Sequence, residues 1–185
     1  MSAKSAGAIG SAREPIDAAV LVPIYRDAAG ELRVVLLRRT AGGPHGGQIA
    51  FPGGKLDTTD PSLRDAALRE AWEEIGLDPS AVEILTPLDP FETRATGFRI
   101  YPFLARVTRP EQWTIAEREV AEVLEPRVRD LVDPANRGHV MERFEGWPAP
   151  IRIDYIYIGP HRLWGATYKI LTAMLPRLLA GEWSV

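Results

Sequence analysis

The 185-residue chain contains no cysteine. That absence excludes a thiol nucleophile, a disulfide framework and a cysteine-based zinc site. The longest apolar runs are also far too short for a transmembrane helix, and the N-terminal residues lack the charged and apolar regions of a signal peptide. We therefore expect a cytoplasmic protein that does not bind a membrane.

The chain also lacks an excess of positive charge. Its formal net charge is -3, whereas a protein that binds duplex nucleic acid normally presents a basic face. Nucleic acid is therefore not an expected partner. A small anionic substrate is still compatible with this charge, because a bound metal ion and a few local Arg or Lys side chains can outweigh it.

The rest of the composition is typical of a globular protein, with 45% hydrophobic and 25% charged residues. A length of 185 residues suits a single domain with a substantial core. Residues 1–15 are rich in Ser, Ala and Gly. We therefore expect a loose N-terminal tail over residues 1–15 and one domain over residues 16–185.

One stretch, residues 51–77, organises the rest of the chain, and its second half predicts a helix. Asp60 can cap the N-terminus, and Pro61 suits the first helical position. Residues 63–75 contain no helix breaker. Gly76 stands where a left-handed cap would end the helix.

This helix is expected to be apolar on one side and acidic on the other, because successive residues turn by about 100°. The apolar side would hold Leu68, Ala71, Trp72 and Ile75, and the acidic side Glu70, Glu73 and Glu74. Three carboxylates at these spacings repel one another unless a cation lies among them. Hard divalent cations such as Mg²⁺ prefer oxygen ligands, so the acidic side predicts a metal site.

An ordinary solvated helix face would show the same charges. Gly53 and Gly54 favour the metal site, because a loop with two glycines lets the backbone approach a ligand closely. Arg69 lies one turn before Glu73 and is expected to pair with that carboxylate and orient it.

These residues resemble the Nudix box, the motif of the Nudix hydrolase superfamily. Residues 69–77, Arg-Glu-Ala-Trp-Glu-Glu-Ile-Gly-Leu, are similar to its second half, and Gly54 matches its opening glycine. The general box has five residues, a Glu and seven more residues between that glycine and the Arg. Here Asp60 replaces the Glu, and eight residues follow it.

The same variant resembles the branch of Nudix enzymes that includes the coenzyme A pyrophosphatases. Residues 45–54 are similar to the end of a signature that precedes the box in that branch, and residues 96–103 and 163–167 are similar to later stretches. Gly43 stands where the branch usually has an arginine. Either a residue has been deleted here or a substrate contact is missing.

The resemblance implies a Nudix-type α/β/α sandwich and metal-dependent hydrolysis of a diphosphate linkage, in which the metal ion acts as a Lewis acid and activates water. By this resemblance the ligands of Mg²⁺ or Mn²⁺ would be Glu70, Glu74, Glu73 and the Gly53 carbonyl. The general base would be Glu119, then Glu122, or one of the box glutamates. Coenzyme A would give adenosine 3′,5′-bisphosphate and 4′-phosphopantetheine.

Five side chains are candidates for binding the substrate: Arg38, Arg39, His45, Arg94 and Arg99. Arginine suits bidentate recognition of phosphate, and a cation can also contact the face of an adenine. Each of these arginines could instead be a solvated charge, and His45 could be structural. Phe91 and Tyr101 could stack on a base, although burial is the commoner fate of such aromatics.

The remaining pattern alternates strands with helices. Strands are expected at residues 18–25, 32–38, 82–88, 98–107, 117–123, 139–144 and 151–158, with hairpin turns at 27–30 and 147–150. Loops are expected at 40–47, at 89–97 and around His161, and helices at 126–131 and 166–180. The fold class is therefore α/β, with a mixed sheet between helical layers.

Three functions follow from these observations. One is hydrolysis of coenzyme A or acyl-coenzyme A, and another is hydrolysis of ADP-ribose, a dinucleotide or an oxidised nucleotide. The third is a catalytically silent Nudix-like module, against which the complete set of Arg69, Glu70, Glu73 and Glu74 argues. The expected partner is a small nucleotide. A homodimer is one option that the sequence does not decide.

Overall fold

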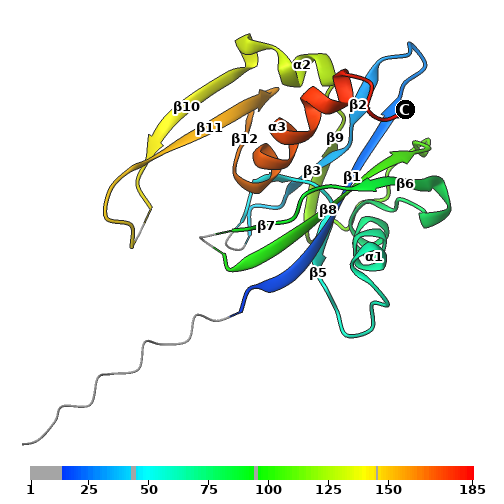
Figure 1. The fold of residues 1–185 in the computed structure, drawn as a ribbon, viewed down its shortest axis with the longest axis horizontal. Helices are drawn as coiled ribbons and strands as arrows, with labels where there is room; N and C mark the ends of the chain where they lie inside the picture. The colour runs from blue at the N-terminus through cyan, green and yellow to red at the C-terminus, as the bar shows by residue number, and fades with distance from the viewer. Residues whose placement is uncertain (1–13, 43–44, 94–95, 145) are drawn as a thin grey trace, which may run out of the picture.

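The computed structural model describes residues 14–42, 45–93, 96–144 and 146–185 (Figure 1). Residues 1–13 of the expected tail lie outside these ranges, as do Gly43 and Arg94. No helix within the described ranges has both the length and the apolar composition needed to cross a membrane.

The central sheet is built on β1 (Ile16–Arg26) and β8 (Phe98–Val107), which pair in parallel. Antiparallel strands flank them in the order β2-β1-β8-β6, with β2 at Leu32–Val34 and β6 at Val82–Pro87. Two further short strands join the sheet: β5 (Gly53–Lys55) beside β1, and β7 (Phe91–Glu92) beside β8. The sheet is therefore mixed, as the sequence predicts.

Two smaller sheets complete the strands of the described residues. The first has the order β4-β3-β9, with β3 at Leu36–Arg39, β4 at Ile49–Ala50 and β9 at Val120–Leu124. The second has the order β10-β11-β12, with β10 at Arg137–Glu142, β11 at Ile151–Ile158 and β12 at His161–Leu163. The hairpin of β10 and β11 extends away from the body of the molecule (Figure 1). The short helix α2 (Val128–Val132) precedes it, and the 3₁₀ turns are η1 (Pro79–Ala81) and η2 (Pro134–Asn136).

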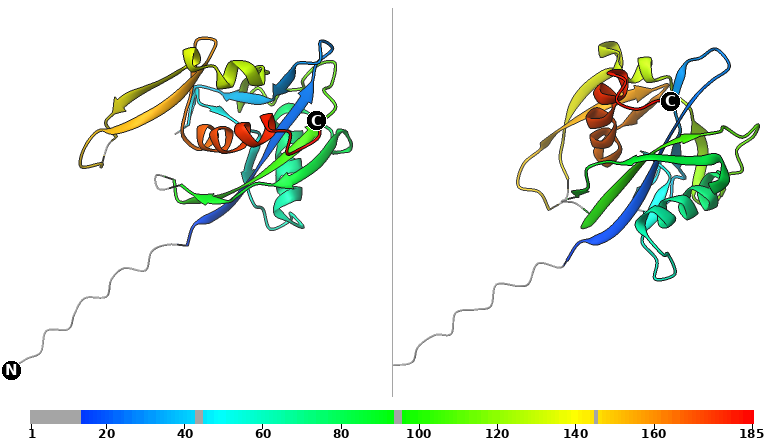
Figure 2. Two further views of the ribbon diagram at one scale, coloured as in Figure 1. Left: turned by 45° about the horizontal axis from the view of Figure 1, so that its top comes forward. Right: turned by 45° about the vertical axis from the view of Figure 1, so that its right-hand side comes forward.

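Two long helices lie on opposite sides of β1 and β8: α1 (Leu63–Ile75) and α3 (Gly165–Leu179) (Figure 2). Alternate side chains of β1 face the two helices. Val22 and Ile24 pack in the cluster around α3, whereas Ala19 and Leu21 pack in the cluster around α1. This period of two is the pattern of a strand that is buried on both faces. The result is the α/β/α arrangement that the sequence predicts.

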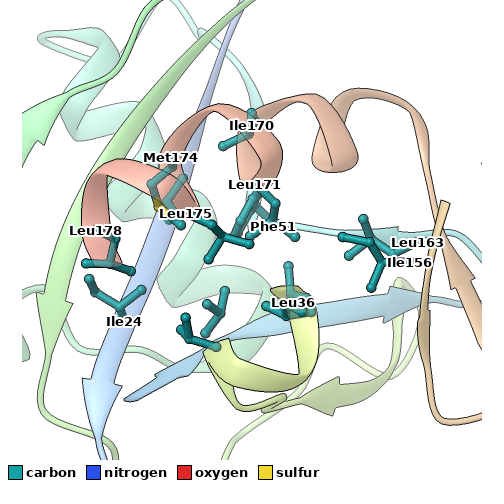
Figure 3. Close-up of a cluster of buried hydrophobic side chains, with 14 of the residues drawn as sticks. Ile24, Leu36, Phe51, Ile156, Leu163, Ile170, Leu171, Met174, Leu175 and Leu178 are labelled. Carbon is teal, nitrogen blue, oxygen red and sulfur yellow. The ribbon is translucent and has the colours of Figure 1, made fainter. Parts of the chain in front are cut away.

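The α3 side of the sheet holds the larger side chains. Leucine, isoleucine and methionine residues of α3 point toward the strands and toward Leu36 and Phe51 (Figure 3). The side chains of Leu171, Met174 and Leu175 are almost completely excluded from solvent. The expectation that the apolar stripe of this helix is core is confirmed.

The start of α1 differs from the prediction. The helix begins at Leu63, and Ser62 is its N-cap, with the Ser62 hydroxyl accepting a hydrogen bond from the Asp65 backbone N–H at 3.2 Å. Serine competes well with aspartate for this position. Asp60 is therefore not a cap, and its carboxylate is free to bind Arg69. The predicted end is confirmed, because Gly76 has φ of 68° and caps the helix in the left-handed conformation.

The orientation of α1 also differs from the prediction. Trp72, assigned above to the apolar side, is 53% exposed, whereas Glu74, assigned to the acidic side opposite it, is only 3% exposed. The helix packs through the small residues Ala66, Ala67 and Ala71, which allow close approach to β1, and the bulk of Trp72 does not fit this contact. The buried side of α1 therefore includes one of the three box glutamates.

Four shorter predictions are corrected by the structure. Gly53 and Gly54 are not in a loop but in β5, where they pair with Val20 and Ala19. The predicted loop at 89–97 contains strand β7, and the predicted strand at 117–123 begins only at Val120. His161 lies in strand β12 and not in a loop. Gly53 and Gly54 pair with the distant strand β1, and Val120 begins a strand paired with the distant β3. Strands β7 and β12 pair instead with their sequence neighbours β8 and β11, which short apolar runs did not reveal.

Candidate active site

Arg69 is the centre of a network of carboxylates at the start of α1. Its Nε and Nη2 atoms donate to the two carboxylate oxygens of Asp60 at 2.8 and 2.9 Å. Its Nη1 atom donates to Glu70 and to Glu73, both at 3.0 Å. The expected pairing of Arg69 with Glu73 is therefore present. The guanidinium is held on two sides and fixes two box glutamates relative to each other.

Asp60 anchors this network from outside the helix. Its carboxylate is 4% exposed and also accepts a hydrogen bond from the Asp57 backbone N–H at 2.8 Å. The hydrogen bonds from Arg69 hold the pKa of Asp60 below its usual value. Asp60 therefore remains charged at neutral pH and serves as a permanent counter-ion for Arg69.

Glu74 is a buried carboxylate with too little positive charge around it. Its Oε2 atom accepts a hydrogen bond from the Gly53 backbone N–H at 2.9 Å, and its Oε1 atom lies 3.5 Å from Nη1 of Arg39. Burial, with a smaller contribution from the charges of Glu70 and Glu119, raises the pKa of Glu74 to about 7, although the Gly53 hydrogen bond and Arg39 oppose the rise. An additional cation near Glu74 would relieve this cost.

Glu70, like Glu74, has a raised pKa. Burial raises its pKa, Arg69 opposes that rise, and the charges of Glu73 and Glu119 add to it. Glu119, in the turn before β9, therefore acts on both Glu70 and Glu74. The charge of Glu73 contributes to the raised pKa of Glu70, and the Glu73 side chain is 54% exposed.

The two glycines of β5 permit this arrangement. A Cβ atom at Gly54 would overlap the carboxylate of Glu70, and one at Gly53 would overlap the backbone of Ala19 and Val20. Only glycine leaves the space that the Glu70 carboxylate occupies behind the strand. The glycine pair thus acts by close packing within a strand, not by flexibility.

The donors present suit a hard divalent cation. Within the described ranges no three acidic or histidine side chains converge closely enough to hold a metal ion by themselves. Mg²⁺ usually keeps several water ligands and takes one or two protein carboxylates, so three converging side chains are not required. Glu70 and Glu74 are oxygen donors whose pKa values are raised chiefly by burial, which a bound cation would offset. The residues therefore fit such an ion.

A cavity of about 630 Å³ lies on the other side of Gly53 and Gly54, and both glycines line it. Its floor is apolar and comes from the sheet and α3, at Val20, Ile49, Ile100 and Ile170. One wall is aromatic and comes from the β10–β11 hairpin and the start of α3, at Phe144, Trp147 and Trp164. The ring centroids of Phe144 and each of the two tryptophans are 6.2 Å apart. Such a volume and lining are typical of a site for a small organic ligand.

Polar groups enter the cavity from several elements. The charged and amide side chains among them include Arg39, His45, Gln48 and Lys169. The first turn of α3 also borders the cavity, and its N-cap, Trp164, makes no side-chain capping hydrogen bond. The cavity therefore combines an apolar body with a few polar contacts at its rim.

The structure brings some of the candidate residues to this cavity and not others. Arg39 and His45 line it. Arg38 instead pairs with Glu122, with Nε donating to Oε1 at 2.6 Å, and His161 Nε2 lies 3.4 Å from the same oxygen. Arg99 pairs with Glu92 at 2.9 Å. Neither Arg38 nor Arg99 is among the described residues that line the cavity.

Sequence reasoning missed Lys169 and the aromatic wall. Lys169 interrupts the apolar stripe of a helix that otherwise reads as core, and Trp147 stands beside a proline in a hairpin turn. These were the available signals, and neither one places its residue in a cavity. Phe91, considered above for base stacking, does line the cavity, and Nζ of Lys169 lies 4.2 Å from its ring centroid.

Comparisons with known proteins agree with this geometry. Residues 15–144 match the model of the NUDIX domain family. A curated relative from Salmonella paratyphi B, named "Uncharacterized Nudix hydrolase NudL", is 35% identical over 158 residues, which span 83% of this chain and 78% of the relative.

Solved structures show the same fold. A Nudix hydrolase from M. smegmatis, RenU, superposes with a TM-score of 0.63 at 16% identity, over 92% of this chain and 89% of that protein. An Ap4A hydrolase from C. elegans, solved as a binary complex, gives a TM-score of 0.51 at 23% identity, over 62% and 82% of the two chains. These likenesses extend to the arrangement of the sheet and helices.

Proposed function

The chain belongs to the NUDIX domain family and is a Nudix pyrophosphohydrolase, and from this premise we propose that its substrate is coenzyme A or acyl-coenzyme A. Water would cleave the P–O–P linkage, so that its oxygen joins one phosphorus and the other phosphate leaves on the bridging oxygen. The products would be adenosine 3′,5′-bisphosphate and 4′-phosphopantetheine or its acyl derivative. The cofactor would be Mg²⁺ or Mn²⁺.

One observation carries this proposal: the box carboxylates lie directly behind two glycines that line the cavity. Glu74 accepts from the Gly53 N–H, and the space beside Gly54 is filled by the Glu70 carboxylate. A diphosphate placed against Gly53 and Gly54 would therefore meet the most acidic part of the molecule. Such an arrangement serves catalysis only when a cation lies between the two sets of anions.

Glu70 and Glu74 would hold the metal ion, with Glu73 and the Gly53 carbonyl as further donors. When bound, this ion would neutralise charge on the diphosphate and make water easier to deprotonate. Arg69 keeps Glu70 and Glu73 in place through its hydrogen bonds to Asp60. Arg39, which lines the cavity and lies near Glu74, would contact the substrate phosphates.

Glu119 is our proposed general base, with a box glutamate as the alternative. Its charge contributes to the raised pKa of both Glu70 and Glu74, which supports a location near the carboxylates that would surround the reacting water. A base in that position could accept the proton as the water attacks. Glu122 is less suited, because it is engaged with Arg38.

The choice of coenzyme A rests on two observations. The segment from His45 to Gly54 resembles the signature of the coenzyme A pyrophosphatase branch, and the structure places both ends of that segment on the cavity. The lining of the cavity is also mostly apolar, which suits the pantetheine arm and an acyl chain.

A different nucleoside diphosphate derivative is the second candidate. It is favoured by Gly43, which replaces the arginine usual in that branch. ADP-ribose, a dinucleotide such as diadenosine tetraphosphate, and an oxidised nucleotide belong to this class. These compounds share an anionic diphosphate with coenzyme A, so the same carboxylates would bind the metal ion for their hydrolysis.

The experiment is a substrate panel with phosphate release coupled to a phosphatase. The full chain is assayed with Mg²⁺ and with Mn²⁺ against coenzyme A, acyl-coenzyme A, ADP-ribose, dinucleotides and oxidised nucleotides. Preferential cleavage of coenzyme A supports the first candidate, and preferential cleavage of another nucleotide supports the second. Absence of cleavage with either metal would overturn both and favour a binding module.

Two broader expectations belong to the same proposal. We propose that residues 16–185 form one domain, which is supported by the apolar clusters on the two faces of the shared β1–β8 pair. We also propose a cytoplasmic location, which suits an enzyme of nucleotide metabolism without cysteine.

A further inference from the structure

Lys169 is a cation in the cavity without a carboxylate partner. Among the described residues, no Asp or Glu lies within ion-pair distance of its ammonium group. Arg39, the other permanent cation among the described residues that line the cavity, is in contrast shared with Glu74 at 3.5 Å. Lys169 therefore has positive charge to offer to a ligand.

The ammonium group of Lys169 is held over an aromatic ring. Its Nζ atom lies 4.2 Å from the ring centroid of Phe91, which itself lines the cavity from strand β7. Lysine side chains on a helix surface usually extend into water, so a cation over an aromatic ring marks a fixed position.

The base of the side chain is fixed as well. Two residues before Lys169 in α3, the buried hydroxyl of Thr167 donates to the carbonyl of Ile49 in β4 at 3.1 Å. That bond ties the start of α3 to the segment that carries Gln48 into the cavity. Lys169 therefore projects from an anchored turn, and its charge is preorganised.

Lys169 is separate from the proposed reaction centre. Glu70 and Glu74 belong to α1, and α1 and α3 lie on opposite sides of β1 and β8 (Figure 2). The hydrogen bonds of Arg69, Asp60 and Gly53 that order the carboxylates do not involve α3. Lys169 also lies beyond residues 15–144, the part of the chain that matches the family model.

From this geometry we propose that Lys169 is a specificity-determining residue that binds a phosphate monoester of the substrate, outside the diphosphate that is hydrolysed. The substrate class is a nucleoside diphosphate derivative that carries a third phosphate on its ribose. The proposal rests on the proposed function for the identity of the reaction, but not for the binding of the phosphate.

A phosphate is the anion best suited to this site. Lysine binds phosphate as a point charge through three rotatable donors. The apolar floor and aromatic wall limit the water that can screen the interaction, which strengthens it relative to a surface contact. A phosphate monoester also carries more charge than a bridging phosphate, so it would compete best for a lone ammonium group.

The test measures binding without turnover. Isothermal titration calorimetry, with a metal chelator present, measures the affinity for adenosine 3′,5′-bisphosphate and for AMP. A second comparison sets adenosine 2′,5′-bisphosphate against AMP. We expect the parent protein to bind at least one bisphosphate about ten- to a hundredfold more tightly than AMP. The two bisphosphates distinguish a 3′-phosphate from a 2′-phosphate.

Three variants make the test specific. Lys169→Met keeps an unbranched side chain only one atom shorter and a similar helix propensity but removes the charge, and it should abolish most of the preference. Lys169→Arg should retain it. Arg177→Met is the matched control, because Arg177 lies on the same helix, also over an aromatic ring at 4.7 Å, and does not line the cavity.

The proposal is overturned if the parent protein binds bisphosphate and AMP equally. It is also overturned if Lys169→Met weakens both ligands by the same factor, since that would indicate a general effect on the cavity. Thermal melts of all variants show whether they are folded, and a poorly folded Lys169→Met is replaced by Lys169→Gln.

Hydrolysis rates give an independent readout. If coenzyme A is cleaved, Lys169→Met should raise KM for coenzyme A but leave KM for dephospho-coenzyme A unchanged. Equal effects on the two substrates count against the proposal. If no nucleotide is cleaved while the binding preference depends on Lys169, the proposed function is wrong and this inference is upheld.

Discussion

Arg69 and Asp60 form a double hydrogen bond, in which Nε and Nη2 of the arginine reach the two carboxylate oxygens at 2.8 and 2.9 Å. This pair joins α1 to the turn that precedes it. Since the remaining nitrogen of Arg69 holds Glu70 and Glu73, Asp60 determines where two box glutamates stand without contacting either of them. The aspartate at this point of the box is therefore a positioning residue.

The first prediction concerns Asp60→Asn. The amide keeps the shape of the carboxylate but turns one acceptor into a donor that faces Arg69, so the double hydrogen bond is lost. We expect a loss of stability of about 1–3 kcal/mol, the range for hydrogen bonds to charged groups. We also expect a lower kcat, because Glu70 and Glu73 lose their common anchor. Urea unfolding and steady-state kinetics measure the two effects.

Asp65→Asn serves as the comparison for Asp60→Asn, because Asp65 lies at the exposed start of the same helix and bonds only to Ser62. It should leave kcat close to that of the parent. Equal loss of kcat in both variants would contradict the positioning role of Asp60.

The second prediction concerns Glu70→Gln and Glu74→Gln. Each variant should lower the affinity for Mg²⁺ or Mn²⁺, with a parallel loss of activity. Mutation of residues that merely support metal ligands costs roughly 10–100-fold in affinity, and loss of a ligand should cost at least as much. Glu74→Gln should not lose stability in the absence of metal, because it removes a buried charge. Metal titration by calorimetry and thermal melts measure these effects.

Glu83→Gln is the matched control for the two glutamate variants, since Glu83 is exposed on β6 and pairs with Arg106. Activity at the parental level in Glu70→Gln and Glu74→Gln, with every substrate tested, would refute the proposed metal site and the chemistry built on it.

The third prediction concerns Gly54→Ala. The added Cβ would overlap the Glu70 carboxylate, so that side chain must leave its position. We expect a large loss of activity together with a destabilisation of about 1–3 kcal/mol, as overpacking typically causes. Gly42→Ala is the control, because a Cβ there meets no atom of the described residues within 4 Å. Unchanged activity in Gly54→Ala would show that the close approach of Glu70 to β5 is unimportant.

Strong local patterns allowed much of the fold to be predicted. The observed bounds of β8 coincide with the predicted strand 98–107, and the hairpin at residues 27–30 joins β1 to β2 as expected. Alternation of apolar residues and turn residues such as Gly30 are properties of the sequence itself. The same holds for α3, whose apolar stripe is long and regular.

The orientation of α1 could not be predicted, because the pattern allows two packing faces. Trp72 carries a far larger apolar side chain than Ala67, yet it is 53% exposed, because close contact with β1 selects the alanine face. Glu74 follows Ala71 into the buried side. What decides this is the distance between helix and sheet, which the sequence of the helix does not specify.

The cavity could not be predicted because its parts come from distant segments. Arg39, Gly54 and Lys169 are each unremarkable in their own surroundings, and only the packing of α3 against β4 and the sheet brings them together. In contrast, the box residues lie on one helix and one neighbouring strand. Their spacing, together with the preceding glycines, therefore predicted a common site, although not the hydrogen bonds of Asp60 or the burial of Glu74.

The fourth prediction concerns the pH dependence of stability at the opposite end of β1. Glu125 accepts hydrogen bonds from Tyr25 at 2.7 Å and from Arg109 at 2.8 and 3.1 Å. Burial alone would raise the pKa of Glu125, but the hydrogen bonds from Arg109 and Tyr25 outweigh it and hold the pKa below the ordinary value. The folded state therefore binds a proton at Glu125 less readily than the unfolded state does.

The sign of the effect follows from this difference. The stabilisation by Glu125 should be fully present above the unfolded-state pKa of about 4.3, and should be lost as the pH falls below it. Glu125→Gln should be less stable than the parent by about 1–3 kcal/mol at pH 7, and the difference should shrink toward pH 3. Denaturant unfolding from pH 3 to 7 measures it, and a difference that is constant with pH would contradict the ionic role.

The fifth prediction concerns the aromatic wall of the cavity. Trp147 lines the cavity from the turn between β10 and β11, where its ring packs against Phe144. It lies far in the sequence from the box, and the hydrogen bonds and ion pairs of Arg69 and Glu74 with described residues do not involve it. We therefore expect Trp147→Ala to weaken substrate binding and to spare the chemical step.

Loss of one aromatic contact with a base or an apolar arm should raise KM about five- to a hundredfold, by analogy with the roughly 1–3 kcal/mol that base stacking on a side chain contributes. The value of kcat should change little, because the carboxylates and Arg69 keep their hydrogen bonds. Tyr157→Ala is the matched control: Tyr157 is an aromatic residue of the same hairpin, is 43% exposed and does not line the cavity. A fall in kcat at constant KM for Trp147→Ala would instead place this wall at the reaction centre, since uniform binding and transition-state stabilisation separate in that way.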